Sequence, residues 1–473
     1  MSFRSFVLIV AFSAALPVRA APNDTRRVLP GPQPGLNPQT SACGDVPAGP
    51  LSLPDLVDLA LCRNPATAVA WAANRTAAAQ VGIARAAELP TASVSFGPTL
   101  SRTDSFGGQQ FTLPSGQSFT ATTSDTSLGS SASLAIDYLL FDFGGRRARI
   151  DNARAGQRAA LANFADTAQT VALNTVTAFN SLQANVAATT AAEASVTFAR
   201  SSFDLANGRQ RAGVATPADT LQARTSLAQA ELTLVQARGN VRTSEGQLAV
   251  TVGLPPTAQL ELAPTRPLGS ADRLNNDVNK LIAEAERLRP DLAVGRANLD
   301  AARASFRAAR SDTRPSINAS VADNLNYANS STDANNGSVG LSISVPFFNG
   351  YDRTYRLAAA RSEVDRNAAL LEQTRQQAGL DVFTNATAVE TQIRVLATAR
   401  ELIASATASA DIAQGRFKAG VGTFTDLLNA QSALASARQQ LVSADFGVRN
   451  AQAQLARSVG RIGDAVDDMR RRP

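Results

Sequence analysis

The sequence predicts a membrane protein of the α+β class, with four strands and several long helices in each chain. Three observations support this fold. The chain repeats itself: Asn64-Pro65 and Arg289-Pro290 are offset by 225 residues, whereas Gly213 and Gly420 are offset by 207. Four short segments alternate apolar and polar residues, which is typical of strands, and most of the remaining chain has helical periodicity.

The composition excludes several classes of enzyme. The 473 residues include no His and only two Cys, so a Ser-His-Asp triad, a His-ligated zinc and a Cys₄ cluster are impossible. We therefore expect neither a cofactor nor a metal site, and an enzyme remains only a distant alternative. The net charge of +6 is small for this length, so we expect no nucleic-acid partner.

The N-terminal region indicates export from the cytoplasm. Residues 1–20 resemble a signal peptide, with Arg4 before an apolar stretch too short to span a bilayer. We expect cleavage after Ala20. Because no Cys follows that site, the sequence does not indicate a lipid anchor. Residues 21–52 form a Pro-rich linker, and Cys43 and Cys62 are predicted to form a disulfide; two buried free thiols are the alternative.

The two repeats, residues 53–263 and 264–460, have the same predicted order of elements, and residues 461–473 form a tail. Each repeat begins with a helix, followed by two strands, a long helix, a Gly turn and a shorter return helix. The helices are expected at 54–88, 145–208 and 217–252 in the first repeat, and at 273–312, 351–415 and 424–459 in the second.

The strands are predicted from alternating apolar residues, separated by polar loops at about 103–127 and 326–337. The first loop carries about 19 additional residues, which explains the two offsets. The alternating residues are Val94, Phe96, Pro98 and Leu100; Ala132, Leu134, Ile136, Tyr138 and Leu140; Ile317, Ala319 and Val321; and Val339, Leu341, Ile343, Val345 and Phe347.

The return helices carry a heptad pattern. Large residues recur every seven positions, with small residues between them, and this pattern favours an antiparallel coiled coil with a neighbouring helix. The residues are Leu227, Leu234, Val241 and Leu248 with Ala230, Ala237 and Ser244, and Leu434, Leu441, Val448 and Leu455 with Ala437, Ala444 and Ala451.

Four strands cannot close a barrel, and open strand edges do not persist in lipid. If the strands enter a membrane, the chain must therefore oligomerise. Two copies would supply eight strands, which leave room only for side chains. Three copies would supply a twelve-strand β-barrel wide enough for a conduit. The long helices, about 96 Å at 1.5 Å per residue, would project from it.

The chain resembles the TolC family of outer-membrane export channels over residues 52–460. The resemblance rests on Asn64-Pro65, on Arg289-Pro290-Asp291-Leu292, and on the segments 416–423 (RFKAGVGT) and 426–431 (DLLNAQ). It implies a homotrimer in the outer membrane, in which the twelve-strand barrel continues as a periplasmic barrel of twelve helices. It also implies a periplasmic adaptor and an inner-membrane transporter as partners.

Within this class, we expect type I secretion of a protein toxin with an ABC transporter, as in the CyaE-type component. The sequence lacks the Cys after the signal and the Gly-rich C-terminus that efflux members often have. A drug or metal efflux pump, with an RND transporter, is the alternative. A soluble periplasmic coiled-coil scaffold is more distant, because it leaves the four strands unexplained.

The resemblance implies that the two Gly turns are periplasmic tips that contact the adaptor. The predicted contact residues are Gly213, Val214, Gly420, Val421, Gly422 and Thr423. The two turn glycines also suit the positive φ found at helix C-termini, and this structural explanation is compatible with docking.

The resemblance also implies a pore constriction at the tips. Its predicted residues are Asp219, Asp426, Asn429 and Phe417. A ring of three Asp426 side chains would favour cations. The structural alternative is that both acids stabilise the first turn of a helix. Asn429, Phe417 and Gly422 replace an acid, a tyrosine and an arginine of the family pattern. We therefore expect a weaker closed state, or one held by packing of Phe417.

Overall fold

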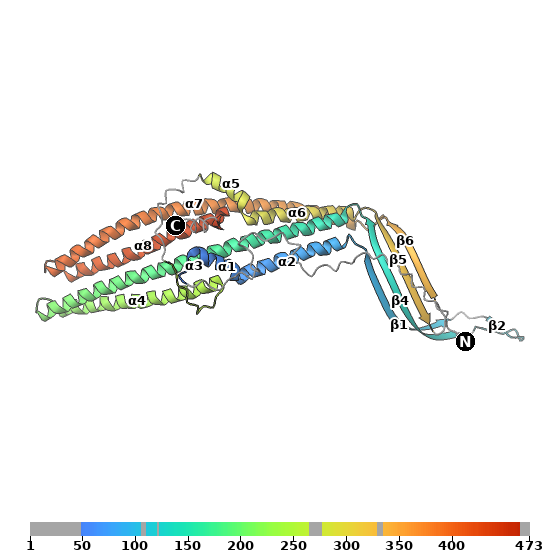
Figure 1. The fold of residues 1–473 in the computed structure, drawn as a ribbon, viewed down its shortest axis with the longest axis horizontal. Helices are drawn as coiled ribbons and strands as arrows, with labels where there is room; N and C mark the ends of the chain where they lie inside the picture. The colour runs from blue at the N-terminus through green and yellow to red at the C-terminus, as the bar shows by residue number, and fades with distance from the viewer. Residues whose placement is uncertain (1–48, 106–109, 121–122, 264–276, 329–333, 464–473) are drawn as a thin grey trace.

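The computed structural model describes residues 49–105, 110–120, 123–263, 277–328 and 334–463. A sheet lies at one end of an elongated protein, and two helical hairpins form the opposite end (Figure 1). The signal segment 1–20, most of the Pro-rich linker and most of the C-terminal tail lie outside the described residues. Cys43 lies outside them too, so its pairing with Cys62 stays a prediction.

The sheet is antiparallel and has the order β1-β4-β5-β6. Its strands are β1 (Thr91–Ser105), β4 (Thr123–Phe141), β5 (Ser316–Ala328) and β6 (Ala334–Ser344). The four predicted strands are therefore confirmed. Apolar side chains on one face are exposed in the single chain, with Phe96 75% and Leu341 67% exposed. Such a face requires an apolar partner or lipid.

The strands extend further than the sequence pattern predicted, and the predicted loop 103–127 is wrong in part. β1 and β4 pair as far as Ser105 and Thr123, although their distal residues are polar. Within the additional residues of the first repeat, β2 (Gln110–Thr112) and β3 (Ser118–Thr120) form a small separate hairpin. Backbone pairing does not require alternating apolar residues, so the hydrophobic pattern missed these extensions.

The long helices α3 (Gly145–Arg211) and α7 (Asp352–Lys418) each contain 67 residues, or about 100 Å at 1.5 Å per residue. The return helices α4 (Pro217–Val252) and α8 (Phe424–Val459) each contain 36 residues. The predicted bounds of the return helices are confirmed. The equal lengths in the two halves show that the repeat detected in the sequence is a repeat of structure.

The predicted single helices 54–88 and 273–312 are wrong. Each is two helices: α1 (Leu53–Arg63) and α2 (Pro65–Ala86), and α5 (Val278–Leu288) and α6 (Pro290–Ser311). The residue before each proline, Asn64 or Arg289, has an extended backbone with ψ near +125°. Proline disfavours the helical conformation of the residue before it, which ends the first helix.

The helices pack side by side in an order that changes along the protein. Near the sheet the order is α2, α3, α6, α7, and near the opposite end it is α4, α3, α8, α7. The heptad seam of α8 is buried against α7, whereas the corresponding residues of α4 are mostly half-buried. The buried residues of the α8 seam are Leu434, Ala437, Ala444, Val448, Ala451 and Leu455.

No helix among the described residues is both long and apolar enough to cross a membrane.

Candidate functional site at the helical tips

The two tip turns, at the ends of the hairpins, have nearly identical geometry. Gly213 and Gly420 have φ angles of +74° and +78°, in the left-handed region that favours glycine. The amide of Val214 donates to the carbonyl of Arg209 at 3.0 Å, and the amide of Val421 donates to that of Arg416 at 3.0 Å. These bonds are those of a Schellman motif, which satisfies free carbonyls where a helix ends.

Two threonine–aspartate pairs begin the return helices. The backbone amide of Asp219 donates to Oγ1 of Thr216 at 3.3 Å, and the amide of Asp426 donates to Oγ1 of Thr423 at 3.1 Å. Each carboxylate accepts from the threonine amide in return, which completes a capping box. The structural explanation for both acids, stabilisation of a helix start, is therefore present.

Asp426 nevertheless keeps an exposed charge. The hydrogen bond from the Thr423 side chain lowers the pKa of this carboxyl, and the Thr423 backbone amide lowers it further. The carboxylate is therefore ionised at neutral pH while it caps the helix. A capping role and a role in a charged ring are compatible, because capping occupies only part of the acceptor capacity of a carboxylate.

Phe417 is buried in the protomer, with only 4% of its surface exposed. Its ring centroid lies 5.4 Å from that of Phe424, and the guanidinium of Arg209 lies 4.8 Å from the Phe417 centroid. Nη1 of Arg209 also donates to the carbonyl of Phe417 at 2.6 Å. Arg209 therefore joins the tips of the two hairpins, whereas the contact between Phe417 and Phe424 lies within the second hairpin.

The other two departures from the family pattern have clear positions. A Cβ at Gly422 would lie 3.1 Å from Cβ of Arg416 and 3.2 Å from the Phe417 amide nitrogen, so a glycine fits this turn more easily than a larger residue. Asn429 lies on a groove of about 840 Å³ between α3, α4 and α8, which is lined mainly by small and polar side chains.

Arg209 is the tip residue that the sequence reasoning missed. Its pairing with Phe417 spans 208 residues and no local pattern indicates it. The burial of Phe417 could have been found, because it continues a heptad along α7 that faces the seam of α8. The members of that heptad are Val382, Val389, Leu396, Ile403, Ala410 and Phe417.

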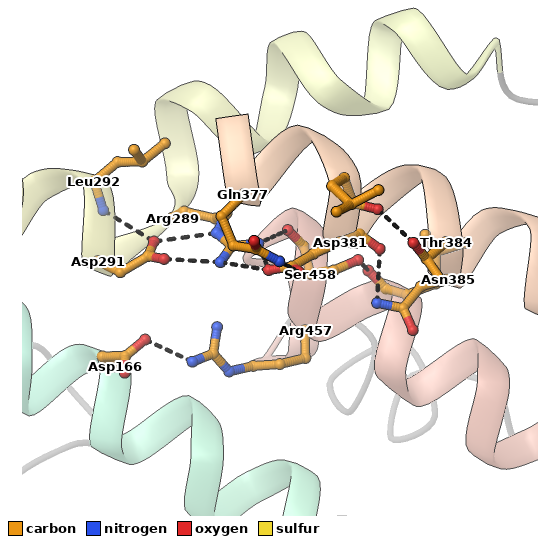
Figure 2. Close-up of polar contacts among 12 residues, drawn as sticks. Asp166, Arg289, Asp291, Leu292, Gln377, Asp381, Thr384, Asn385, Arg457 and Ser458 are labelled. Carbon is orange, nitrogen blue, oxygen red and sulfur yellow. Dashed lines mark hydrogen bonds and ion pairs between the residues drawn. The ribbon is translucent and has the colours of Figure 1, made fainter. Parts of the chain in front are cut away.

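A second polar cluster lies midway along the helices, where α5 meets α6 (Figure 2). The Arg289 guanidinium donates to both oxygens of Asp291, at 3.1 and 2.7 Å, and twice to Oδ2 of Asp381, at 3.0 and 3.1 Å. A fifth bond reaches the carbonyl of Ser458 at 3.3 Å. Arg289 is the buried centre of this cluster, with a side chain 9% exposed.

The charges of this cluster stabilise one another. Burial on its own raises the pKa of Asp291, but the hydrogen bonds and positive charge of Arg289 outweigh burial, and the net pKa is lowered. Gln377 donates to the other oxygen of Asp381 at 2.8 Å. Nearby, Arg457 donates to Asp166 at 2.5 Å, which links α8 to α3 (Figure 2).

We call this meeting point of two helices and the end of a return helix a joint. The first repeat has an uncharged version of it. Asn64 takes the place of Arg289, and its Nδ2 donates to the carbonyl of Thr251 at 2.8 Å. Thr251 lies two residues before Gly253, just as Ser458 lies two residues before Gly460. In both halves the residue before the proline therefore bonds to the end of a return helix.

No group of three or more His, Cys, Asp or Glu side chains capable of holding a metal occurs in the part of the chain that the structure describes.

Comparisons with known proteins agree with this architecture. Residues 56–254 and 281–461 match the model of the outer membrane efflux protein family. The chain belongs to this family. Its members are outer-membrane channels rather than enzymes, and the protein is accordingly an export channel of the TolC type that lies in the outer membrane and extends into the periplasm.

Two relatives show how far the similarity extends. Protein CyaE of Bordetella pertussis is 29% identical over 436 residues, covering 88% of this chain and 86% of CyaE. The outer membrane protein TolC of Escherichia coli is 25% identical over 312 residues, covering 63% of this chain and 62% of TolC.

Solved structures share the fold. The outer-membrane channel OprN has a TM-score of 0.75 at 22% identity and covers 86% of this chain and 89% of its own. The outer membrane channel CmeC of Campylobacter jejuni also has a TM-score of 0.75, at 17% identity, with 89% of each chain covered. The predicted fold of four strands and long helices is confirmed.

Proposed function

We propose that three copies of the protein form one outer-membrane channel that exports a protein by type I secretion. The observation that carries this proposal is the similarity to CyaE, which extends over 88% of the chain. The similarity to the solvent efflux pump outer membrane protein SrpC of Pseudomonas putida extends over only 57%. Drug or solvent efflux is the second candidate, because such relatives do match part of the chain.

The sheet supports assembly of three copies. β1 and β6 are its two edges, so each has backbone groups that are unpaired within the described chain. A head-to-tail arrangement, with β1 of one copy beside β6 of the next, removes these edges when the ring closes. Three copies give twelve strands, enough for a conduit.

Both outer helices, α7 and α4, carry exposed apolar side chains that neighbouring copies could cover. Leu380 and Phe383 of α7 are 56% and 57% exposed and line a shallow groove of about 420 Å³. At the opposite edge of the protomer, Leu232 and Val235 of α4 are 50% and 67% exposed. Burial of these side chains between neighbouring copies would contribute roughly 1.5–3 kcal/mol for each residue that becomes fully buried.

The tip turns are the proposed docking sites of a periplasmic adaptor, which would connect the channel to an inner-membrane ABC transporter. Val214 and Val421 are 63% and 70% exposed, beside the turn glycines. Exposed valines beside these turns are suited to contact with a partner protein. Cysteines introduced at these two positions should crosslink to the adaptor, and the absence of any crosslink would argue against this docking site.

The first experiment is the mass of the protein extracted from outer membranes in mild detergent. A trimer is expected. A monomer that is released without detergent would overturn the channel proposal. Deletion of the gene should then abolish export of a secreted protein and leave tolerance to small toxic compounds unchanged. Loss of that tolerance with normal secretion would favour the efflux pump.

The proposed ring of Asp426 is tested by comparing two variants. Asp426→Asn removes the charge but keeps an acceptor for the capping box, whereas Asp426→Ala removes both. If the ring sets selectivity, both variants should lower the preference of single channels for cations. A change in Asp426→Ala alone would show that only the helix cap matters.

A further inference from the structure

Positive charge is concentrated where the helices meet the sheet. Residues 142–161, at the start of α3, and residues 296–315, at the end of α6, contain ten arginines and four aspartates. Their net charge of +6 equals that of the whole chain. The two helices pack against each other directly beside the strands (Figure 1).

Three exposed arginines occupy equivalent positions at this junction. Arg85 lies six residues before β1, Arg147 lies six residues after β4, and Arg310 lies six residues before β5. Among the described residues, none of the three side chains has an ion-pair or hydrogen-bond partner. Other arginines at the junction do have one: Arg149 lies 2.7 Å from Asp312.

Stabilisation of helix ends does not explain the positions of all three arginines. Arg85 and Arg310 lie in the last turns of α2 and α6, where a positive charge interacts favourably with the helix dipole. Arg147 lies in the first turn of α3, where a positive charge is unfavourable. Asp142 caps this helix start, but its ion pair is with Arg146 rather than with Arg147. A positive charge at this position therefore suits a negative group outside the protein.

Exposed aromatic side chains lie at the same level, close to the strand ends. They are Phe141, Phe143, Phe347, Phe348, Tyr351 and Tyr355, all at least 44% exposed. Such side chains concentrate at the interface between lipid and water. The opposite ends of the strands carry no comparable positive charge, since their charged residues are Arg102, Asp104, Asp125 and Asp323.

We propose that Arg85, Arg147 and Arg310 bind the phosphate groups of anionic phospholipids in the periplasmic leaflet of the outer membrane. The headgroup region on each side of a bilayer is about 5–7 Å thick. The three arginines lie six residues from a strand end, in the helix turns nearest the strands, and their long side chains can extend toward the headgroups. The inference rests on insertion of the strands into the outer membrane, as the family implies.

The test uses full-length protein, purified in a neutral detergent and freed of lipid. Phosphatidylglycerol or the zwitterionic phosphatidylethanolamine is added, and bound lipid is counted by native mass spectrometry. Wild type should prefer phosphatidylglycerol. Each arginine near an anionic surface contributes about fivefold to binding. The variant Arg85→Gln/Arg147→Gln/Arg310→Gln should therefore lose most of the preference, and inorganic phosphate alone should not bind measurably.

A matched control removes the same charge far from the sheet. Arg224, Arg242 and Arg400 are exposed on α4 and α7, and Arg224→Gln/Arg242→Gln/Arg400→Gln should retain the wild-type preference. Equal loss in both triple variants, or no preference in wild type, would overturn the inference. The same spectra give the mass of the oligomer. Failure to form a trimer would count against the proposed channel, and it can be distinguished from loss of lipid binding by a trimer.

Discussion

Replacement of Arg289 tests the joint between α5, α6 and the end of α8. Arg289→Ala removes four hydrogen bonds to two carboxylates and one to the Ser458 carbonyl. Breaking a fully buried ion pair costs about 3–5 kcal/mol. Because the Asp291 and Asp381 side chains are 31% and 34% exposed and can be hydrated, we expect a smaller cost, about 2–3 kcal/mol.

Hydrogen exchange measures this loss without requiring reversible unfolding of a membrane protein. A local cost of about 2–3 kcal/mol should speed amide exchange in α5 and the start of α6 by about 30- to 150-fold. Arg289→Asn introduces asparagine, the residue that the first repeat has at the equivalent position, Asn64. It can keep a cap bond like that of Asn64 to Thr251, so its effect should be smaller than that of Arg289→Ala.

The double variant Arg289→Ala/Asp381→Asn provides a further control. It removes one of the carboxylates left without a partner, so part of the lost protection should return. Exchange in Arg289→Ala within threefold of wild type would refute the reasoning, because the ion pairs would then contribute almost nothing to the joint.

Three further predictions concern other sites. Because the pKa of Asp291 is lowered on folding, its ion pair should stabilise the joint fully above about pH 4 and lose this effect as pH falls further; Asp291→Asn should flatten that dependence of exchange on pH. Gly253→Ala should cost more than about 2 kcal/mol locally and speed amide exchange at the end of α4 by more than about 30-fold, since φ is +87° and a Cβ would lie 2.7 Å from the Arg63 carbonyl oxygen. Gly239→Ala, in open space within α4, should instead be neutral or stabilising. Phe417→Ala should loosen the tips by about 3–5 kcal/mol and raise the resting conductance of single channels, whereas unchanged conductance would exclude packing of Phe417 as the closure.

Periodicity and repetition predicted most of the fold. The return helices 217–252 and 424–459 have the bounds that the sequence predicts. In the structure each follows a threonine cap and ends before a glycine. The helix breaks at Asn64 and Arg289 were visible as Asn-Pro and Arg-Pro, yet the apolar pattern continues across them. The effect of proline on the preceding residue should have outweighed that pattern.

At the helical tips, the sequence predicts only those features that depend on residues close together in the chain. The capping acids Asp219 and Asp426, and the turn glycines, follow from short-range chemistry. The contact of Arg209 with Phe417 depends on how two hairpins pack against each other, and a single sequence contains no direct signal for it. The polar ends of β1 and β4 were missed for a different reason, because their pairing uses backbone groups that every residue has.

The joints at Asn64 and Arg289 also determine how many helices lie side by side in each chain above and below them. Each return helix ends at a joint, and α2 or α6 takes over its place beside the uninterrupted α3 and α7. Outside the level at which the short helices α1 and α5 lie against α3 and α7, a cross-section on either side of the joints therefore cuts four helices per chain. A closed ring of three chains would have the same circumference at both heights, so the bore would neither narrow nor widen where the helices change partners.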